Sequence, residues 1–243
     1  MTNEGVSDPP IRLFVLGGFR LNGSIEPPSV IPGEAQHLLA LLAVRGRTVS
    51  RSAIAGTLWP DASESHAYAS LRSALSRMGD LARASILVTN TELVLKQNVI
   101  VDLLEARALA HRLLDPRSAP QSADLTAEAI RTLTSECLPD WYEEWALIES
   151  EEWRQLRLHA LDSLTLHMTA AGRFGDAIGA AMAAMRADPL RESACAALIR
   201  VHLAEGNQSE AIRAFERYRA LLVRELGVEP TPKLRRLLPP TRS

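Results

Sequence analysis

The sequence predicts a mixed α+β domain at the N-terminal end and an all-α domain after it. Short apolar runs bounded by turn residues, which are typical of strands, occur only before residue 102. Apolar residues at helical spacing continue from there almost to the end of the chain. One segment of the second half also recurs 34 residues later. With 243 residues, of which 47% are hydrophobic, the chain is long enough for two packed domains.

The first elements are expected to be short strands. Residues 11–16 form the first, which ends at Gly17 and Gly18, and residues 19–21 form the second. The Asn22-Gly23 pair that follows favours a hairpin turn, because both central residues of a type I′ turn need positive φ. Residues 29–31 are a candidate third strand. We therefore expect a three-stranded meander, which is too narrow to be stable alone.

Three helices and a second strand pair come next. The first helix starts at Pro32 and stops at Gly46, and the second starts with Ser50 as N-cap and ends before Pro60. A third follows residue 61 or 63, and its apolar side chains form one stripe: Ala67, Leu71, Ala74, Leu75 and Met78. Strands over residues 86–88 and 93–95 then flank a polar turn. A sheet, three helices and a hairpin in this order predict a winged helix.

The second half predicts a helical array. Helices are expected over residues 102–114, 122–136, 141–170, 174–187, 191–204 and 208–226. Gly172 and Ala177 recur as Gly206 and Ala211, a shift of 34 positions, which is the period of tetratricopeptide (TPR) repeats. Glycine permits a tight turn between helices, and alanine lets paired helices approach closely. A TPR-like domain is therefore predicted, and such domains usually contact other proteins.

Composition and motifs argue against several classes of protein. No apolar run approaches the roughly 18 residues of a membrane span, and the polar, acidic residues 1–10 are unlike a secretory leader. Cys137 and Cys195 stand alone, so we expect neither disulfides nor a metal site and infer a reducing, intracellular compartment. Phosphate-loop, nucleophile-elbow and dinucleotide-binding motifs are absent. The sequence predicts no enzyme, no catalytic residues, no cofactor and no membrane partner.

Several short motifs resemble those of the Streptomyces antibiotic regulatory protein (SARP) family. In the first half they are residues 16–17 (LG), 38–42 (LLALL), 49–50 (VS), 58–59 (LW) and 71–78. In the second half they are residues 157–161 (RLHAL), 172–173 (GR), 188–192 (DPLRE) and 225–230 (ELGVEP). The likeness covers almost the whole chain. The last two runs are long enough that chance is a poor explanation.

The resemblance implies a winged helix of the response-regulator output type joined to a bacterial transcriptional activator domain. It further implies an activator in the bacterial cytoplasm, associated with the nucleoid, that binds repeats in double-stranded promoter DNA. Self-association on those repeats, recruitment of RNA polymerase holoenzyme and control of an antibiotic or other secondary-metabolite gene cluster are implied as well. The expected domains are a disordered segment 1–10, the winged helix 11–101, the TPR-like domain 102–238 and a tail 239–243.

The candidate DNA-reading surface is the polar face of the third helix. At 100° per residue, the face opposite the apolar stripe collects Ser65, Ala69, Arg72, Ser73 and Ser76, with His66 and Arg77 on its flank. Small residues let a helix backbone approach the major groove, and arginine can bind guanine bidentately. We assign base reading to Arg72 and phosphate contact to Arg77. Arg51, in the first turn of the second helix, is expected to hold the DNA backbone together with the helix amides.

The nearly neutral charge of residues 1–101 is also consistent with a second function. Residues 1–101 contain nine Lys and Arg against eight Asp and Glu, and the predicted hairpin turn contains Glu92, which would repel phosphate. On pattern alone, the polar helix face could equally be a solvated surface with two ordinary arginines. The alternative function is a TPR-like protein-interaction regulator whose winged helix binds DNA weakly or not at all.

Aromatic residues cluster after residue 140. Trp141, Tyr142, Trp145 and Trp153 suggest either a ligand pocket or packing between helices, and packing is the expectation because such spacing along helices usually serves a core. Trp59, just before Pro60, is likewise expected to fill a core.

Overall fold

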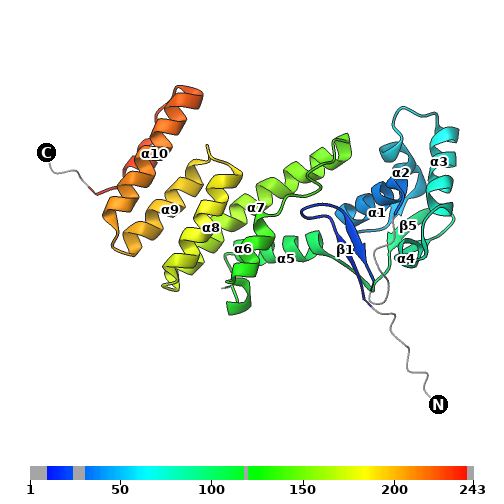
Figure 1. Ribbon diagram of the computed structural model, residues 1–243, viewed down its shortest axis with the longest axis horizontal. Helices are drawn as coiled ribbons and strands as arrows, with labels where there is room; N and C mark the ends of the chain where they lie inside the picture. Colours follow the sequence, from blue (N-terminus) through cyan, green and yellow to red (C-terminus); the bar gives the residue numbers. More distant parts are fainter. Residues whose placement is uncertain (1–9, 24–30, 118–119, 240–243) are drawn as a thin grey trace, which may run out of the picture. The chain divides into compact units, whose positions relative to one another are not determined.

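The computed structural model describes residues 10–23, 31–117 and 120–239 and contains two compact units (Figure 1). Met1–Ala106 and Glu136–Trp153 form a small α/β unit, and Arg107–Ser135 and Arg154–Ser243 form a helical unit. The chain therefore crosses between the units three times, and residues 136–153 pack with the first. Apart from residues 10 and 239, the predicted disordered segment 1–10 and tail 239–243 lie outside the described residues.

The α/β unit contains two three-stranded sheets. In one, β1 (Ile11–Phe14) pairs antiparallel with β2 (Arg20–Asn22) and parallel with β6 (Val99–Val101). In the other, β5 (Glu92–Leu95) lies between β3 (Val49–Ser50) and β4 (Ile86–Val88), both antiparallel to it. The four predicted strands that fall on described residues are thus confirmed, whereas β3 and β6 were not predicted. The third strand predicted at 29–31 falls on residues outside the described part except for Ile31. Of the turn predicted at Asn22-Gly23, Asn22 is the last residue of β2, and the chain after Gly23 is not described.

Three helices of this unit were predicted correctly. They are α1 (Gly33–Arg45), α2 (Arg51–Leu58) and α3 (Glu64–Ser76). Gly46 ends α1 in the left-handed conformation, with φ of 59°, and the Ser50 hydroxyl accepts the Ala53 N–H at 3.2 Å as the N-cap of α2. A short fourth helix, α4 (Asp80–Ala84), was missed.

A half-buried carboxylate fixes the end of β1 to the start of α5 (Asp102–Leu114). Asp102 accepts backbone N–H groups from Val15 at 2.9 Å, Leu16 at 3.1 Å and Leu103 at 2.7 Å. Burial raises the pKa of this carboxyl group, although the three hydrogen bonds oppose the rise. These contacts hold the turn after β1, which also receives the returning segment 136–138.

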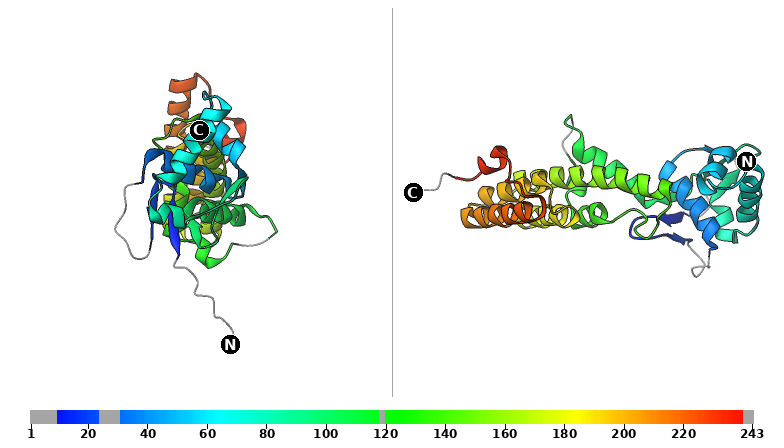
Figure 2. Two further views of the ribbon diagram at one scale, coloured as in Figure 1. Left: turned by 90° about the vertical axis from the view of Figure 1, so that its right-hand side faces the viewer. Right: turned by 90° about the horizontal axis from the view of Figure 1, so that it is seen from above.

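The helical unit follows the predicted order with small differences. The predicted helix 122–136 is a 3₁₀ turn, η1 (Ser122–Asp124), and a separate α6 (Ala127–Thr134). The predicted helix 141–170 starts later, as α7 (Glu144–Ala170). The next three are α8 (Phe174–Ala187), α9 (Glu192–Ala204) and α10 (Gln208–Leu226), within one residue of prediction, and they lie side by side (Figure 2). A last short helix, α11 (Pro232–Arg235), was missed.

The repeated residues lie where their chemistry requires. Gly172 and Gly206 precede α8 and α10 with φ of 71° and 87°, so both turns use backbone conformations that favour glycine. Ala177 and Ala211 are completely buried one turn into these helices. A larger side chain at either alanine would have to displace the neighbouring helix.

The pair between Arg112 and Asp124 leads to a pH prediction. Asp124 is 6% exposed and accepts from Arg112 Nη2 at 2.7 Å and Nε at 3.1 Å, which lowers the pKa of its carboxyl group. A carboxylate whose pKa is lower in the folded than in the unfolded protein makes its full contribution to the free energy of unfolding above about pH 4. This contribution is lost as the pH falls through the pKa of the folded state. We expect Asp124→Asn to destabilise the protein by about 1–3 kcal/mol at pH 7, and by progressively less towards pH 2.

Urea unfolding followed by circular dichroism between pH 7 and pH 2 measures this difference. Asp115→Asn is the matched control, because its partner Arg117 is 87% exposed and an ion pair with so exposed a partner should contribute little. A difference between wild type and Asp124→Asn that stays constant with pH would contradict the prediction.

Candidate nucleic-acid interface

The interior side of α3 fixes which residues face outward. Ala67, Leu71 and Ala74 are buried, and Met78, just beyond the helix, is buried as well. This stripe packs with α2 and α1. The predicted inner face of the helix is therefore confirmed for these four residues, whereas Leu75 is only half-buried.

The outer side of α3 presents most of the predicted site residues. Ser65, Ala69, Arg72 and Ser76 are exposed, and their spacing of four, three and four places them on one face. Ser73 is half-buried, and the Ser76 hydroxyl donates to its carbonyl oxygen at 2.9 Å. Arg77 is exposed and forms the C-cap of the helix.

The cations of this face are available for a ligand. Within residues 10–23, 31–117 and 120–239, the guanidinium groups of Arg72 and Arg77 have neither a hydrogen-bond acceptor nor an ion-pair partner. His66 is engaged, because its Nδ1 lies 3.0 Å from the Ser63 hydroxyl. The arrangement is thus a row of small side chains with one unpaired arginine in its middle and another at its end.

Arg83 supports this helix and was not identified from the sequence. Its Nη2 donates to the carbonyl oxygens of Leu75 at 3.3 Å and Ser76 at 3.0 Å, which closes the last turn of α3. Carbonyl groups at the end of a helix attract arginine, but the sequence alone does not show that α4 turns this side chain back towards α3.

Arg51 lies in a different setting from α3. It is the half-buried first residue of α2, and its backbone N–H donates to the Thr91 carbonyl oxygen at 2.8 Å. It therefore lies beside the turn between β4 and β5 rather than on the outer face of α3. The Thr89 hydroxyl accepts the Glu92 N–H at 3.0 Å in that turn, and Glu92 is exposed. Because the N–H groups of Arg51 and Ala53 already have acceptors, α2 offers fewer amides for phosphate than expected.

Among the described residues there is no group of three or more His, Cys, Asp or Glu that could hold a metal ion, and no helix is long and apolar enough to span a membrane. Burial raises the pKa of the Cys195 thiol to about 12, so it is not a nucleophile near neutral pH.

The packing expectation for the aromatic cluster is only partly correct. Trp145 and Trp153 are buried, as expected for core residues, and Trp59 is half-buried. Tyr142 is 79% exposed, so packing was the wrong interpretation for this residue. Trp141 is half-buried and borders a surface cavity, which the sequence offered no means of distinguishing from a core position.

Comparison with known proteins adds a family and two relatives. The family model described as bacterial transcriptional activator domain matches residues 101–239. The regulatory protein AfsR of Streptomyces griseus is 30% identical, and that of Streptomyces coelicolor is 29% identical, each over 93% of this chain. Both alignments cover 24% of the relative, so the chain spans about a quarter of the length of these regulators.

The fold is also similar to that of a solved structure. It is that of Mycobacterium tuberculosis EmbR in complex with a low-affinity phosphopeptide, with a TM-score of 0.67 and 22% sequence identity. The match covers 94% of this chain and 64% of the EmbR chain. At this identity the likeness concerns the fold, a small α/β region followed by a helical domain.

Proposed function

The chain belongs to the SARP family, whose members carry a bacterial transcriptional activator domain, and we propose that it is a transcriptional activator that binds promoter DNA through α3. The main observation in support of this proposal is the outer face of α3, where the unpaired Arg72 lies among small, exposed residues. Such a face can enter the major groove, and the free guanidinium can donate two hydrogen bonds to a guanine.

The first unit supports this role as a winged helix. Helices α1, α2 and α3 and the short α4 are followed by the β4–β5 hairpin. In this proposal the hairpin is the wing and α3 is the recognition helix. Arg72 then reads a base, whereas Arg77 at the end of α3 and Arg51 beside the hairpin turn contact phosphates. Ser65, Ala69, Ser73 and Ser76 complete the surface that approaches the groove.

The second unit supports activation as a TPR-like domain. Its repeated glycine turns and buried alanines let α8, α9 and α10 pack closely, as in helical repeats that bind proteins. In this function the domain helps to recruit RNA polymerase holoenzyme and orients copies of the protein on promoter repeats in the bacterial cytoplasm. Control of a secondary-metabolite gene cluster belongs to the same proposal.

The test starts from capture of sheared genomic DNA of the source organism by the purified chain, followed by fluorescence anisotropy with an enriched fragment. We expect Arg72→Ala to weaken binding of this fragment by about 1–3 kcal/mol, roughly 5- to 150-fold, without weakening binding to a scrambled duplex comparably. Arg77→Ala should weaken binding to both duplexes and reduce the dependence on salt.

Arg186→Ala is the matched control, because Arg186 is an exposed arginine of α8 in the helical unit. Its affinity should equal that of wild type. Wild-type affinity of Arg72→Ala for the enriched fragment would contradict the assignment of Arg72 as base reader.

A second function is favoured by the hairpin turn. Glu92 is exposed there close to Arg51, so an anionic group stands where the proposed wing would approach phosphate. In this alternative the chain regulates transcription by binding another regulator, and DNA is bound weakly or not at all. No enriched fragment, together with duplex binding that hardly responds to salt, would favour this alternative, since phosphate contacts release counterions.

A further inference from the structure

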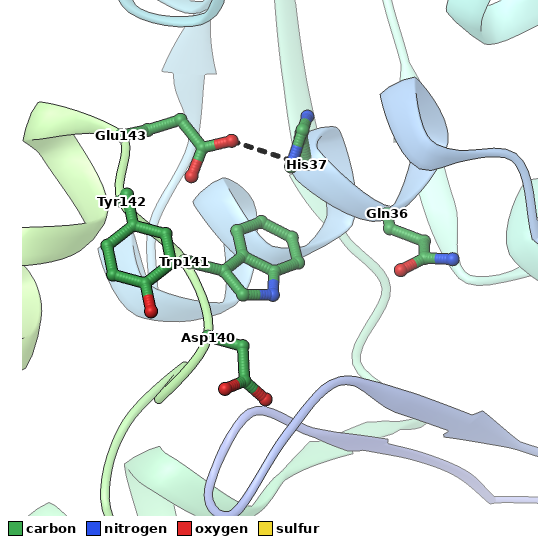
Figure 3. Close-up of a pocket in the computed structure, with 6 residues that line it drawn as sticks. All are labelled: Gln36, His37, Asp140, Trp141, Tyr142 and Glu143. Carbon is green, nitrogen blue, oxygen red and sulfur yellow. Dashed lines mark ion pairs between the residues drawn. The ribbon is translucent and has the colours of Figure 1, made fainter.

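A surface cavity of about 460 Å³ in the α/β unit lies apart from the residues assigned to DNA. Gln36 and His37 of α1 line it together with four consecutive residues before α7, namely Asp140, Trp141, Tyr142 and Glu143. Figure 3 shows the indole ring of Trp141 at the centre of this group, with the Glu143–His37 pair on one side and the Asp140 carboxyl group on the other.

The aromatic wall of the cavity is held rigidly. The Trp141 ring makes edge contacts with His37, at 4.5 Å between ring centroids, and with Trp145 at 5.8 Å. Its backbone N–H donates to the Leu138 carbonyl oxygen at 3.1 Å. Leu138 has a φ of 46°, the one positive value outside glycine among the described residues, and its N–H is held by the Val15 carbonyl oxygen at 2.9 Å. Strained backbone of this kind persists where the surroundings enforce it, and it clusters at functional sites.

Three side chains of the cavity, Gln36, Asp140 and Glu143, present acceptor oxygens. The Gln36 amide nitrogen donates to the Ile31 carbonyl oxygen at 2.8 Å, so the amide presents its oxygen as a free acceptor. The Asp140 carboxylate has no donor or cation among the described residues. Glu143 is 3.0 Å from His37 Nε2, which leaves its second oxygen available. A ligand for these groups must bring several donors and a positive charge.

A guanidinium group meets these requirements better than other common groups. It is planar and stacks on indole, it carries five N–H donors, and it binds carboxylates in a bidentate manner. The surroundings also favour a ligand carried by a protein. Tyr142 lines the cavity and is 79% exposed. Its ring offers an apolar contact to the residues next to an arginine.

We propose that this cavity binds an arginine side chain presented by a protein partner, with stacking on Trp141 and pairing with Asp140. The assignment does not depend on DNA binding by α3, because no residue is shared between the two surfaces. It gives the α/β unit a second binding surface, directed at protein.

The test is a titration of the full chain with an acetylated and amidated Leu-Arg-Leu peptide, followed by nuclear magnetic resonance of the tryptophan indole N–H groups. Trp141→Phe identifies the resonance of Trp141. We expect this resonance to shift with the arginine peptide and to respond at least about tenfold more weakly to the citrulline peptide, which has the same shape without the charge. Asp140→Asn should weaken binding of the arginine peptide about three- to tenfold.

Glu144→Gln is the matched control, because Glu144 is an exposed carboxylate next to the lining residues and should leave the affinity unchanged. Equal responses to the arginine and citrulline peptides, or wild-type affinity of Asp140→Asn, would overturn the proposal. Binding of free guanidinium ion as tight as that of the peptide would overturn the assignment to a protein partner, because the site would then serve a small cation.

Discussion

Phe215→Ala is expected to destabilise the helical unit by about 3–5 kcal/mol, one of the two largest effects that these residues predict. Phe215 of α10 is 3% exposed and belongs to a cluster that includes Ile199 and Cys195 of α9 and Tyr218 of the same helix. Removing the ring loses the free energy gained by burying it and leaves a cavity between two helices. The neighbouring helices are already closely packed through alanine, so they cannot easily move to fill this cavity. Urea unfolding followed by far-ultraviolet circular dichroism measures the loss.

Val223→Ala is the control on the same helix. Val223 is 42% exposed, so its truncation should change stability by no more than about 0.5 kcal/mol. A loss for Phe215→Ala no larger than that for Val223→Ala would show that α10 does not pack on α9 as described. Tyr218 supplies an independent check, because its hydroxyl donates to the Leu190 carbonyl oxygen at 2.9 Å and Tyr218→Phe should cost about 1 kcal/mol.

The helices were predictable because their sequence carries both periodicity and end signals. Gly46 ends α1 and Ser50 starts α2. Each residue stabilises its helix end through local backbone or side-chain geometry, so these two helix ends do not depend on distant parts of the chain. The glycines before α8 and α10 marked their turns in the same way. Strands β3 and β6 were not predicted. They exist only through pairing with β5 and β1, which lie far away in sequence.

The candidate surfaces were predictable to different degrees. Helical geometry alone placed Arg72 on the outer face of α3, since the apolar stripe fixes the rotation of the helix. The contact of Arg51 with Thr91 depends on how β3 and β5 pair, which the sequence does not encode locally. The cavity at Trp141 depends on the return of residues 136–153 to the first unit, so a tryptophan at its edge is indistinguishable in sequence from one in a core.

Leu71→Ala is expected to destabilise the α/β unit by about 2–5 kcal/mol, because Leu71 is completely buried on the inner face of α3. Tryptophan fluorescence follows this unit selectively, since Trp59, Trp141, Trp145 and Trp153 all belong to it. We expect the fluorescence transition in urea to move to lower concentration for Leu71→Ala and to stay in place for Arg72→Ala, the exposed neighbour in sequence.

The two adjacent substitutions also separate folding from recognition. At a low temperature where fluorescence shows Leu71→Ala to be folded, this variant should bind the enriched DNA fragment with nearly wild-type affinity, because its outer face is intact. Arg72→Ala should remain fully folded and still lose affinity. A folded Leu71→Ala protein that binds DNA as poorly as Arg72→Ala would mean that the inner and outer faces of α3 are not separable, and the assignment of Arg72 as a base reader would fail. Opposite responses of two neighbouring residues are what a helix with one face in the core and one face on DNA requires.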